Sequence, residues 1–269
     1  MKTRAITAFF FVLVMFGSLM LGSYVFTLLI LVLSMLALDE FYHLVSTPSV
    51  KPQKITGIIL AISIYLPVYQ YAVKQQSLQN LLLCVPLVIA IIIVELYRKQ
   101  PHPFHNIAYT LLGVIFVAIP FYFFYALAFI DGIYNMHYPL AFLVLLWASD
   151  TGAYLFGSQL AKRKLFERHS PKKSWEGFIG GVFTCVLVAL AISYYFTELP
   201  CAHWLVVALM IAVVGTFGDL SESMLKREVS VKDSGSLLPG HGGILDRFDG
   251  LLLAAPLVFV YLILVYAAR

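Results

Sequence analysis

The stretch AITAFFFVLVMFGSLMLGSYVFTLLILVLSMLAL, residues 5–38, decides the fold class, because it is one apolar run without a charged residue. An α-helix rises about 1.5 Å per residue, and about 20 apolar residues are enough to cross a bilayer. The run is therefore too long for one span. Gly17, Ser18, Gly22 and Ser23 favour a tight turn in its middle. We predict two membrane helices, roughly 5–20 and 23–38.

The composition of the whole chain supports a membrane protein. Of the 269 residues, 61% are hydrophobic and only 12% are charged, whereas soluble domains carry about 25% charged residues. This excludes soluble globular and disordered proteins. A transmembrane barrel would show alternating segments of about 10 residues, but the apolar runs here are longer and continuous. We predict an all-α polytopic membrane protein that forms a single integral-membrane domain over residues 1–269.

Seven further apolar runs bring the predicted number of transmembrane helices to about nine. They cover roughly residues 55–73, 80–97, 107–130, 138–157, 176–196, 201–220 and 249–267. Residues 1–140 consist mainly of these spans and carry no motif that points to chemistry. The catalytic region is therefore expected within residues 141–269.

The distribution of basic residues predicts the orientation, because Lys and Arg are enriched in cytoplasmic loops. A cytoplasmic N-terminus places 16 of the 18 Lys and Arg residues inside and leaves only Lys74 and Arg269 outside. The two longest polar stretches, 158–175 and 221–249, then lie on the cytoplasmic side. We expect a multi-pass protein of the cell membrane whose polar active-site cavity opens to the cytoplasmic face.

Asp150 stands within the apolar sequence LLWASDTGAYLFG, residues 145–157. A charge at the bilayer centre costs at least about 2.5 kcal/mol, so this carboxylate needs a partner, a cavity or an ion. The alternative is an aspartate at the membrane surface that only ends its helix.

A second group of polar residues follows in GDLSESMLKRE, residues 218–228. Asp219, Glu222, Ser223 and Lys226 have the spacing i, i+3, i+4 and i+7, which places them on one face of a helix. The alternative is a solvated helix face stabilised by i,i+4 ion pairs.

The sequence LLPGHGGILDRFDG, residues 237–250, interrupts the chain just before its last apolar run. Glycines permit close approach of the backbone to a ligand, and successive backbone N–H groups in such a turn can bind an anion. Asp246 and Asp249, three residues apart, can face the same way. They are also explained by a favourable interaction with the N-terminal dipole of the last helix.

A basic loop, AKRKLFERHSPKKSWEGFIGG, spans residues 161–181 and includes Lys172 and Lys173. Membrane topology and attraction to anionic lipid headgroups explain most of its charge.

Two other groups of charges have simpler interpretations. Asp39, Glu40 and His43 end the second span and are interpreted as interfacial, and Glu95 is expected to pair with Arg98.

Together these segments bring carboxylates, cations and glycines to one membrane face. Mg²⁺ prefers oxygen ligands and substrate phosphates, and cations together with turn amides bind phosphates. This combination indicates phosphoryl or nucleotidyl transfer. The position at a membrane surface indicates that one substrate is a lipid.

Residues 223–249, SMLKREVSVKDSGSLLPGHGGILDRFD, resemble the signature of phosphatidate cytidylyltransferases, with no departure over these 27 residues. The pattern is Ser-x-x-Lys-Arg, four residues, Lys-Asp-x-Gly, then Leu-Pro-x-His-Gly-Gly-x-x-Asp-Arg-x-Asp. Three further blocks resemble the family in the family's order: SDTGAY (149–154), SPKKSWEG (170–177) and GDLSES (218–223).

The resemblance implies that CTP and phosphatidic acid react to CDP-diacylglycerol and diphosphate with Mg²⁺, and it leaves open a second cation such as K⁺. It also implies a homodimer and no nucleic-acid partner. The implied catalytic residues are Asp219, Asp246, Lys226, Lys232 and Arg247. The implied metal ligands are Asp219, Asp246 and Asp249. The implied substrate-binding residues are Ser149, Asp150, Lys172, Lys173, Ser223, Arg227, Gly240, His241, Gly242 and Gly243.

Substrate chemistry limits what these residues must do. The nucleophile is a phosphate monoester, whose second pKa is about 6, so it is already ionised at pH 7. No strong general base is needed, and His241 is interpreted as a hydrogen-bond donor or loop organiser.

Two other functions remain open at this point. A CTP-dependent polyprenol or dolichol kinase would transfer the γ-phosphate and release CDP instead of diphosphate. An ion-coupled transporter would use Asp150 and Asp219 as intramembrane ion sites. The clustering of the acids at one membrane face disfavours the transporter.

Overall fold

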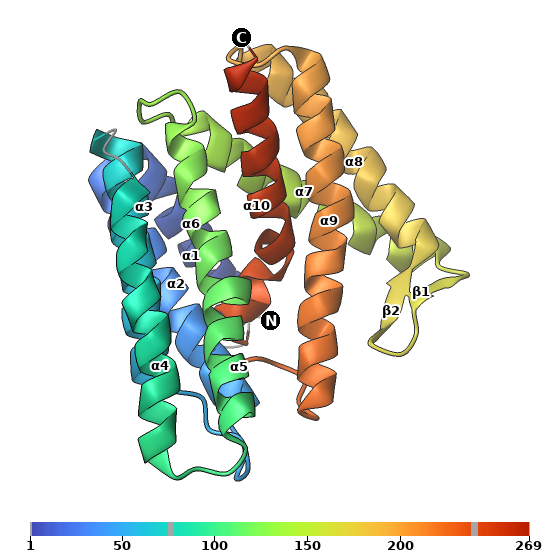
Figure 1. Ribbon diagram of the computed structural model, residues 1–269. Helices are drawn as coiled ribbons and strands as arrows, with labels where there is room; N and C mark the ends of the chain where they lie inside the picture. Colours follow the sequence, from blue (N-terminus) through green and yellow to red (C-terminus); the bar gives the residue numbers. More distant parts are fainter. Residues whose placement is uncertain (1, 75–77, 238–241, 269) are drawn as a thin grey trace. The chain divides into compact units, whose positions relative to one another are not determined.

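A computed structural model describes residues 2–74, 78–237 and 242–268 of the chain, and these residues are predominantly helical (Figure 1). The elements, in chain order, are α1 (Lys2–Met20), α2 (Ser23–Val45), α3 (Lys54–Lys74), the 3₁₀ helix η1 (Leu78–Leu83), α4 (Cys84–Arg98), α5 (Pro103–Gly113), the π-helical η2 (Val114–Ala118), α6 (Ile119–Ala126), the 3₁₀ helix η3 (Leu127–Phe129), α7 (His137–Leu160), β1 (Lys164–Phe166), β2 (Ser170–Ser174), α8 (Trp175–Tyr195), α9 (Cys201–Glu228) and α10 (Leu245–Ala267).

The predicted all-α polytopic architecture is confirmed. Seven helical segments of the described residues are long and apolar enough to cross a membrane, and the apolar stretch Ile6–Met20 in α1 is shorter. With α3, each of the nine predicted segments corresponds to a helical stretch. The departure from an all-α chain is the small antiparallel sheet of β1 and β2. The orientation in the membrane stays a prediction.

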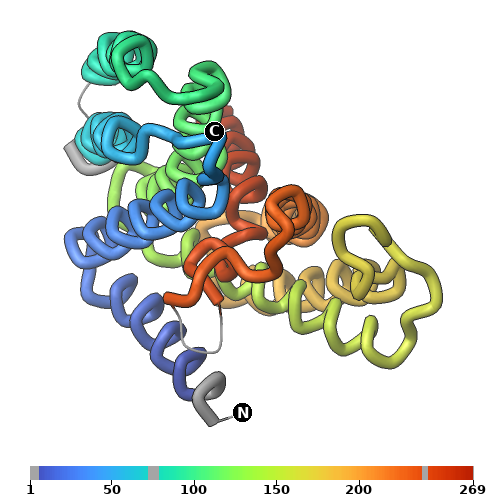
Figure 2. The backbone as a smooth tube through the Cα atoms, turned by 90° about the horizontal axis from the view of Figure 1, so that it is seen from below, coloured from blue at the N-terminus to red at the C-terminus, as the bar shows by residue number. Residues whose placement is uncertain are grey.

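The turn expected inside the first apolar run lies between α1 and α2. Gly22 adopts a positive φ of 102°, a conformation that glycine reaches without the steric cost of a side chain. The chain reverses sharply at this glycine, and Figure 2 shows the two helices diverging from the turn.

The chain divides into two compact units, and the first comprises Met1–Asn135 together with Asp233–Arg247. The second comprises Met136–Lys232 and Phe248–Arg269. Helix α10 therefore begins in the first unit and continues in the second. The boundary between the units after Asn135 lies close to residue 141, where the catalytic region is predicted to start.

Buried tyrosines connect the helices of the first unit. The Tyr42 hydroxyl in α2 donates to the Thr110 carbonyl (2.8 Å), and the Tyr122 hydroxyl donates to the Ala61 carbonyl (2.8 Å). Both rings are almost completely buried. Gly113 leaves room for the Tyr42 ring, because a Cβ there would lie 2.6 Å from Cε1. Each hydroxyl thereby satisfies its hydrogen bond within a helix bundle that offers little water.

A buried carboxylate, Glu95, gathers polar side chains from several helices of the first unit. Its Oε2 accepts hydrogen bonds from Gln53 Nε2 (2.7 Å) and Arg98 Nη1 (2.8 Å). Its Oε1 accepts from Asn106 Nδ2 (2.7 Å). The predicted pair with Arg98 is confirmed, and the added amide donors explain how the charge is tolerated in the interior.

In the second unit, α7 and α8 form the most extensive helix–helix contact. Glycines make this contact close: a Cβ on Gly181 would lie only 2.8 Å from the Ser149 carbonyl oxygen, and one on Gly177 would lie 2.9 Å from the Ala153 carbonyl oxygen. Small residues permit such approach in membranes, where helix association relies on packing and not on the hydrophobic effect.

Glycines also bring α9 and α10 together. A Cβ on Gly218 would lie 3.2 Å from the Gly250 Cα and would collide with the Asp249 carbonyl oxygen. A Cβ on Gly250 would lie 3.4 Å from the Gly215 carbonyl oxygen. The backbone of α10 therefore passes against α9 at the point where α9 carries its acidic residues.

We expect the substitution Gly181→Ala to destabilise the protein. Its Cβ meets backbone, so α7 and α8 must separate, and overpacking of this kind costs about 1–3 kcal/mol. The gain in helix propensity, about 1 kcal/mol, offsets only part of that cost. The thermal midpoint in detergent micelles should fall.

Gly17→Ala is the matched control, because nothing lies within 4 Å of a Cβ at Gly17 in α1. That variant should melt at or slightly above the wild-type temperature. Equal midpoints for Gly181→Ala and Gly17→Ala would contradict the close α7–α8 contact.

Candidate active site

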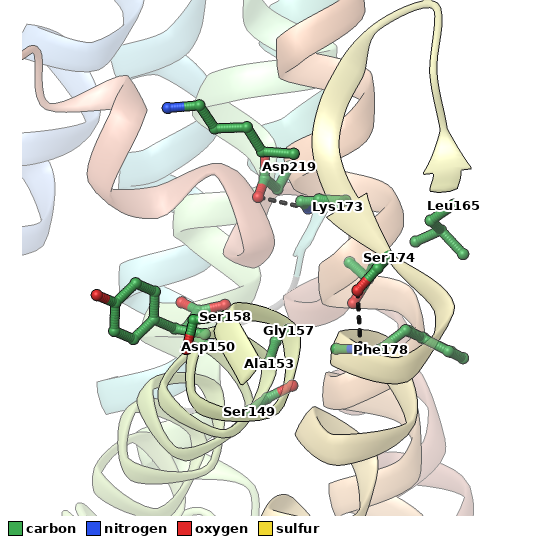
Figure 3. A pocket seen from close by; sticks show the side chains of 14 residues that line it. Ser149, Asp150, Ala153, Gly157, Ser158, Leu165, Lys173, Ser174, Phe178 and Asp219 are labelled. Carbon is green, nitrogen blue, oxygen red and sulfur yellow. Dashed lines mark hydrogen bonds and ion pairs between the residues drawn. The ribbon is translucent and has the colours of Figure 1, made fainter. Parts of the chain in front are cut away.

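A pocket of about 420 Å³ lies in the second unit between α7, the β hairpin, α8 and α9 (Figure 3). This volume falls in the range of small-molecule sites. Its walls include five residues predicted from the sequence: Ser149, Asp150, Lys172, Lys173 and Asp219. Residues more than 60 positions apart in the sequence are thus gathered around one cavity.

The β hairpin holds the two lysines of the pocket. Strands β1 and β2 pair antiparallel, with Lys164 opposite Ser174 and Phe166 opposite Ser170. The prediction of a loop is wrong here, because residues 164–166 and 170–174 form strands. Lysine and proline are depleted in strands, so the sequence SPKKS gives little sign of one. The pairing fixes the direction in which β2 presents Lys172 and Lys173.

Helix α8 begins directly where β2 ends. The Ser174 hydroxyl accepts a hydrogen bond from the Gly177 N–H (3.1 Å) and caps the helix. The Glu176 carboxylate accepts from the Lys162 N–H (3.1 Å) and the Arg163 N–H (3.3 Å) at the base of the hairpin. The Ser-Trp-Glu-Gly part of the predicted SPKKSWEG block therefore anchors the hairpin to α8.

Lys173 forms an ion pair with Asp219 across the pocket. Lys173 Nζ lies 2.5 Å from Asp219 Oδ2, and both side chains are partly exposed to the cavity (Figure 3). Ser223, one turn along α9, donates its hydroxyl to Asp219 Oδ1 (3.2 Å). The orientation of this carboxylate is thus fixed by a cation from the hairpin and a hydroxyl from its own helix.

Three carboxylates form a cluster at the end of α9 and the start of α10: Asp219, Glu222 and Asp249. One oxygen from each lies within 4.8 Å of the other two. Oxygen donors in such a group suit a hard divalent cation such as Mg²⁺. Two of the three, Asp219 and Asp249, were predicted as metal ligands.

Glu222 is the residue of this cluster that the sequence reasoning missed as a ligand. Its side chain is completely buried, and its Oε2 lies 2.6 Å from Lys226 Nζ one turn further along α9. The signal was present in the acidic stripe of residues 218–228, but i,i+4 spacing also suits an exposed ion pair. Burial, which the sequence does not show, distinguishes a carboxylate of the cluster from one in an exposed ion pair.

Two further predicted cations lie outside the pocket walls. The Arg227 side chain donates to backbone carbonyls, from Nη1 to Val231 (3.1 Å) and from Nε to His169 (3.5 Å). Its guanidinium therefore also contacts the β hairpin. Lys232 is exposed after the end of α9.

The remaining predicted residues belong to the first unit. Asp246 Oδ2 accepts hydrogen bonds from the Ser234 N–H and the Gly243 N–H, both 2.9 Å. The Gly243 amide, predicted to bind substrate phosphate, thus already donates to a carboxylate. Gly242 has a positive φ of 83°, and Arg247 is exposed. Gly240 and His241 lie outside the described residues.

Glu40, predicted only as an interfacial residue, contacts the start of α10. Its carboxylate accepts from the backbone N–H groups of Ile244 (2.9 Å) and Leu245 (3.0 Å). No pattern in residues 31–45 links this acid to a segment 200 residues further along the chain. Only the fold reveals the contact.

Similarity to known proteins identifies the family of this chain. The model of the cytidylyltransferase family matches residues 2–265. The chain belongs to this family. The resemblance stated from residues 223–249 is therefore confirmed, and the chain is an enzyme of the nucleotidyltransferase class.

Relatives of this family member cover almost its whole length. A phosphatidate cytidylyltransferase of Staphylococcus aureus (strain COL) is 36% identical over 266 residues, which is 98% of this chain and 99% of the relative. One of Staphylococcus haemolyticus (strain JCSC1435) is 35% identical over 265 residues, with the same coverage. One of Bacillus subtilis (strain 168) is 31% identical over 265 residues, or 98% of each chain.

The acidic cluster of this cytidylyltransferase is expected to bind a divalent cation in the absence of nucleotide. Asp249→Asn removes one anionic ligand without changing the size of the side chain. We expect Mn²⁺ affinity to fall by at least about tenfold, by analogy with losses on perturbing metal sites. Electron paramagnetic resonance of free Mn²⁺ measures it directly.

Glu228→Gln serves as the control, because Glu228 is exposed at the end of α9 and is not part of the cluster. It should bind Mn²⁺ like the wild type. Equal Mn²⁺ affinities for Asp249→Asn and Glu228→Gln would remove the metal assignment.

Proposed function

We propose that this protein is a phosphatidate cytidylyltransferase, which converts CTP and phosphatidic acid to CDP-diacylglycerol and diphosphate in phospholipid biosynthesis. The observation that carries the proposal is the pocket lined by Lys172, Lys173, Asp150 and Asp219, across which Lys173 forms an ion pair with Asp219. Family membership and relatives of that name support it.

The reaction forms one P–O bond and breaks another. A phosphate oxygen of phosphatidic acid attacks the α-phosphorus of CTP, and the bond from that phosphorus to the oxygen bridging to the β-phosphate breaks. Diphosphate leaves with that bridging oxygen. Since the attacking phosphate is already ionised near neutral pH, the protein has to align two anions and offset their charge.

Lysines and carboxylates have complementary roles in this proposal. Lys172 and Lys173 bind substrate phosphates from the hairpin, and Lys226, Arg227, Lys232 and Arg247 are proposed as further phosphate contacts. Ser149 and Ser223 supply hydroxyl groups near the carboxylates. The pair between Lys173 and Asp219 would then open when substrate phosphate offers the lysine a second anion.

The proposed cofactor is Mg²⁺, and the donor set fits it. Asp219, Glu222 and Asp249 would hold the ion through carboxylate oxygens. When bound, it would neutralise charge on the triphosphate and polarise the phosphorus–oxygen bonds. Asp246 stays a predicted ligand, although its Oδ2 is engaged with two backbone amides. A second cation such as K⁺ stays open.

Phosphatidic acid is a membrane lipid, so the polytopic architecture suits the substrate. We propose that the pocket opens to the cytoplasmic face of the cell membrane, as the distribution of basic residues indicates. We also propose a homodimer, which the resemblance implies. A CTP-dependent lipid kinase is disfavoured, because the family and the named relatives are cytidylyltransferases.

The substitution Lys173→Met tests the site. It keeps a long apolar stem but removes the charge that meets Asp219. We expect kcat/KM for CTP to fall by about 100- to 1,000-fold, the usual effect of removing one group that stabilises developing phosphate or oxyanion charge. Diphosphate release by purified protein with phosphatidic acid vesicles is the measurement.

Lys164→Met, on the other strand of the same hairpin, is the control, because Lys164 is exposed and does not line the pocket. It should retain kcat/KM within about twofold. If Lys164→Met were as impaired as Lys173→Met, the effect would come from the net charge of the hairpin, and the specific role of Lys173 would be refuted.

A further inference from the structure

The N-terminus of α10 already holds an anion, and that anion is part of the protein. The Glu40 carboxylate accepts the N–H of Ile244 through Oε1 (2.9 Å) and the N–H of Leu245 through Oε2 (3.0 Å). The first amides of a helix lack intrahelical partners and attract anions. The sequence predicts phosphate binding by the glycine turn just before this helix, and the structure places the Glu40 carboxylate at the two amides that follow that turn.

The same carboxylate also contacts Ser234, which precedes the glycines at positions 240, 242 and 243 in the chain. The Ser234 hydroxyl donates to Glu40 Oε2 (3.3 Å). Two glycines make room for this carboxylate: a Cβ on Gly235 would lie 2.9 Å from Glu40 Oε1, and one on Gly243 would collide with Glu40 Oε2. Glu40 thus occupies a space that both glycines leave empty.

A second carboxylate, that of Asp246, contacts the backbone at both Ser234 and Gly243. Asp246 Oδ2 accepts from the Ser234 N–H and the Gly243 N–H, both at 2.9 Å. Ser234 and Gly243, nine residues apart, are therefore held by Glu40 and Asp246 together. All of these contacts lie within the first unit.

We infer that Glu40 is a positioning residue for cytidylyl transfer. Its carboxylate contacts the backbone at the start of α10 and the hydroxyl of Ser234. Helix α10 is continuous from Leu245 to Ala267, and Asp249 of the acidic cluster follows Leu245 by one turn. The Glu40 contact at Leu245 therefore acts on the same continuous helix that carries Asp249. The inference rests on the proposed function.

Asp39 is a matched control one residue away. Its carboxylate pairs with His43 (3.0 Å) and Lys54 (3.8 Å) and is nearly half exposed. Asp39→Asn removes the same charge from the same end of α2 without touching the segment that Glu40 holds. A general effect of charge at the end of α2 would affect both positions.

The first experiment compares the kcat of Glu40→Ala, Glu40→Gln and Asp39→Asn with that of the wild type. Each kcat is calculated from the concentration of folded, monodisperse protein. We expect Glu40→Ala to lower kcat by about 10- to 100-fold, as loss of a supporting contact usually does, with the KM for phosphatidic acid unchanged within twofold. Glu40→Gln should recover part of this loss, because its amide oxygen still accepts a backbone N–H. Asp39→Asn should match the wild type.

Two outcomes would overturn the inference. A kcat of folded Glu40→Ala within twofold of the wild type would reduce Glu40 to a contributor to stability. A lower KM for CTP in Glu40→Gln would show that the carboxylate competes with nucleotide phosphate for these amides.

If Glu40→Ala does not fold, Glu40→Gln and Ser234→Ala are combined in a double-mutant cycle. Coupled effects on kcat support the inference, and additive effects overturn it.

Hydrogen–deuterium exchange tests the contact between Glu40 and the first amides of α10 without any assay of activity. In the wild type and in Asp39→Asn, the amides of Ile244 and Leu245 should exchange slowly. In Glu40→Gln they should exchange at least about tenfold faster, because one charged acceptor is lost. Unchanged protection of these amides in Glu40→Gln would overturn the inference that Glu40 holds the start of α10. A wild-type protein that is inactive with CTP and phosphatidic acid would instead refute the proposed function.

Discussion

Glycine contacts between helices are the constraint on which the site of the second unit depends. Gly177 and Gly181 let α8 approach the backbone of α7, and Gly218 lets α9 approach α10. Because a lipid environment gives no hydrophobic drive between helices, this close packing has to supply much of the attraction. It also sets the spacing of the polar groups, since Asp150, Asp219 and Asp249 each lie within a few residues of such a contact.

The architecture could be predicted from the sequence because apolar runs of about 20 residues permit few alternatives in a membrane. Helix spacing also placed Asp219, Ser223 and Lys226 on one face. The hairpin of residues 164–174 escaped prediction because strand propensity is weak in SPKKS and the pairing involves few residues. Glu40 escaped prediction because its partners are backbone amides 200 positions away, which leave no mark in a local pattern.

Carboxylates serve two separate purposes in this protein, and the groups that contact them distinguish the two. Glu40, Glu95 and Asp246 accept several hydrogen bonds each from nearby amides or side chains. They organise the backbone of the first unit. Asp219, Glu222 and Asp249 instead face one another and two lysines, Lys173 and Lys226. Carboxylates this close together repel one another unless cations lie between them, and the proposed divalent cation would meet this condition.

The central claim is that this site transfers the cytidylyl group of CTP to a lipid phosphate. The most direct measurement follows two labels, one on the α-phosphate and one on the γ-phosphate of CTP, during incubation of the purified protein with phosphatidic acid vesicles. The α-label should enter the organic lipid phase, and the γ-label should stay in the aqueous phase as diphosphate. Transfer of the γ-label to lipid would contradict this claim and would identify a lipid kinase.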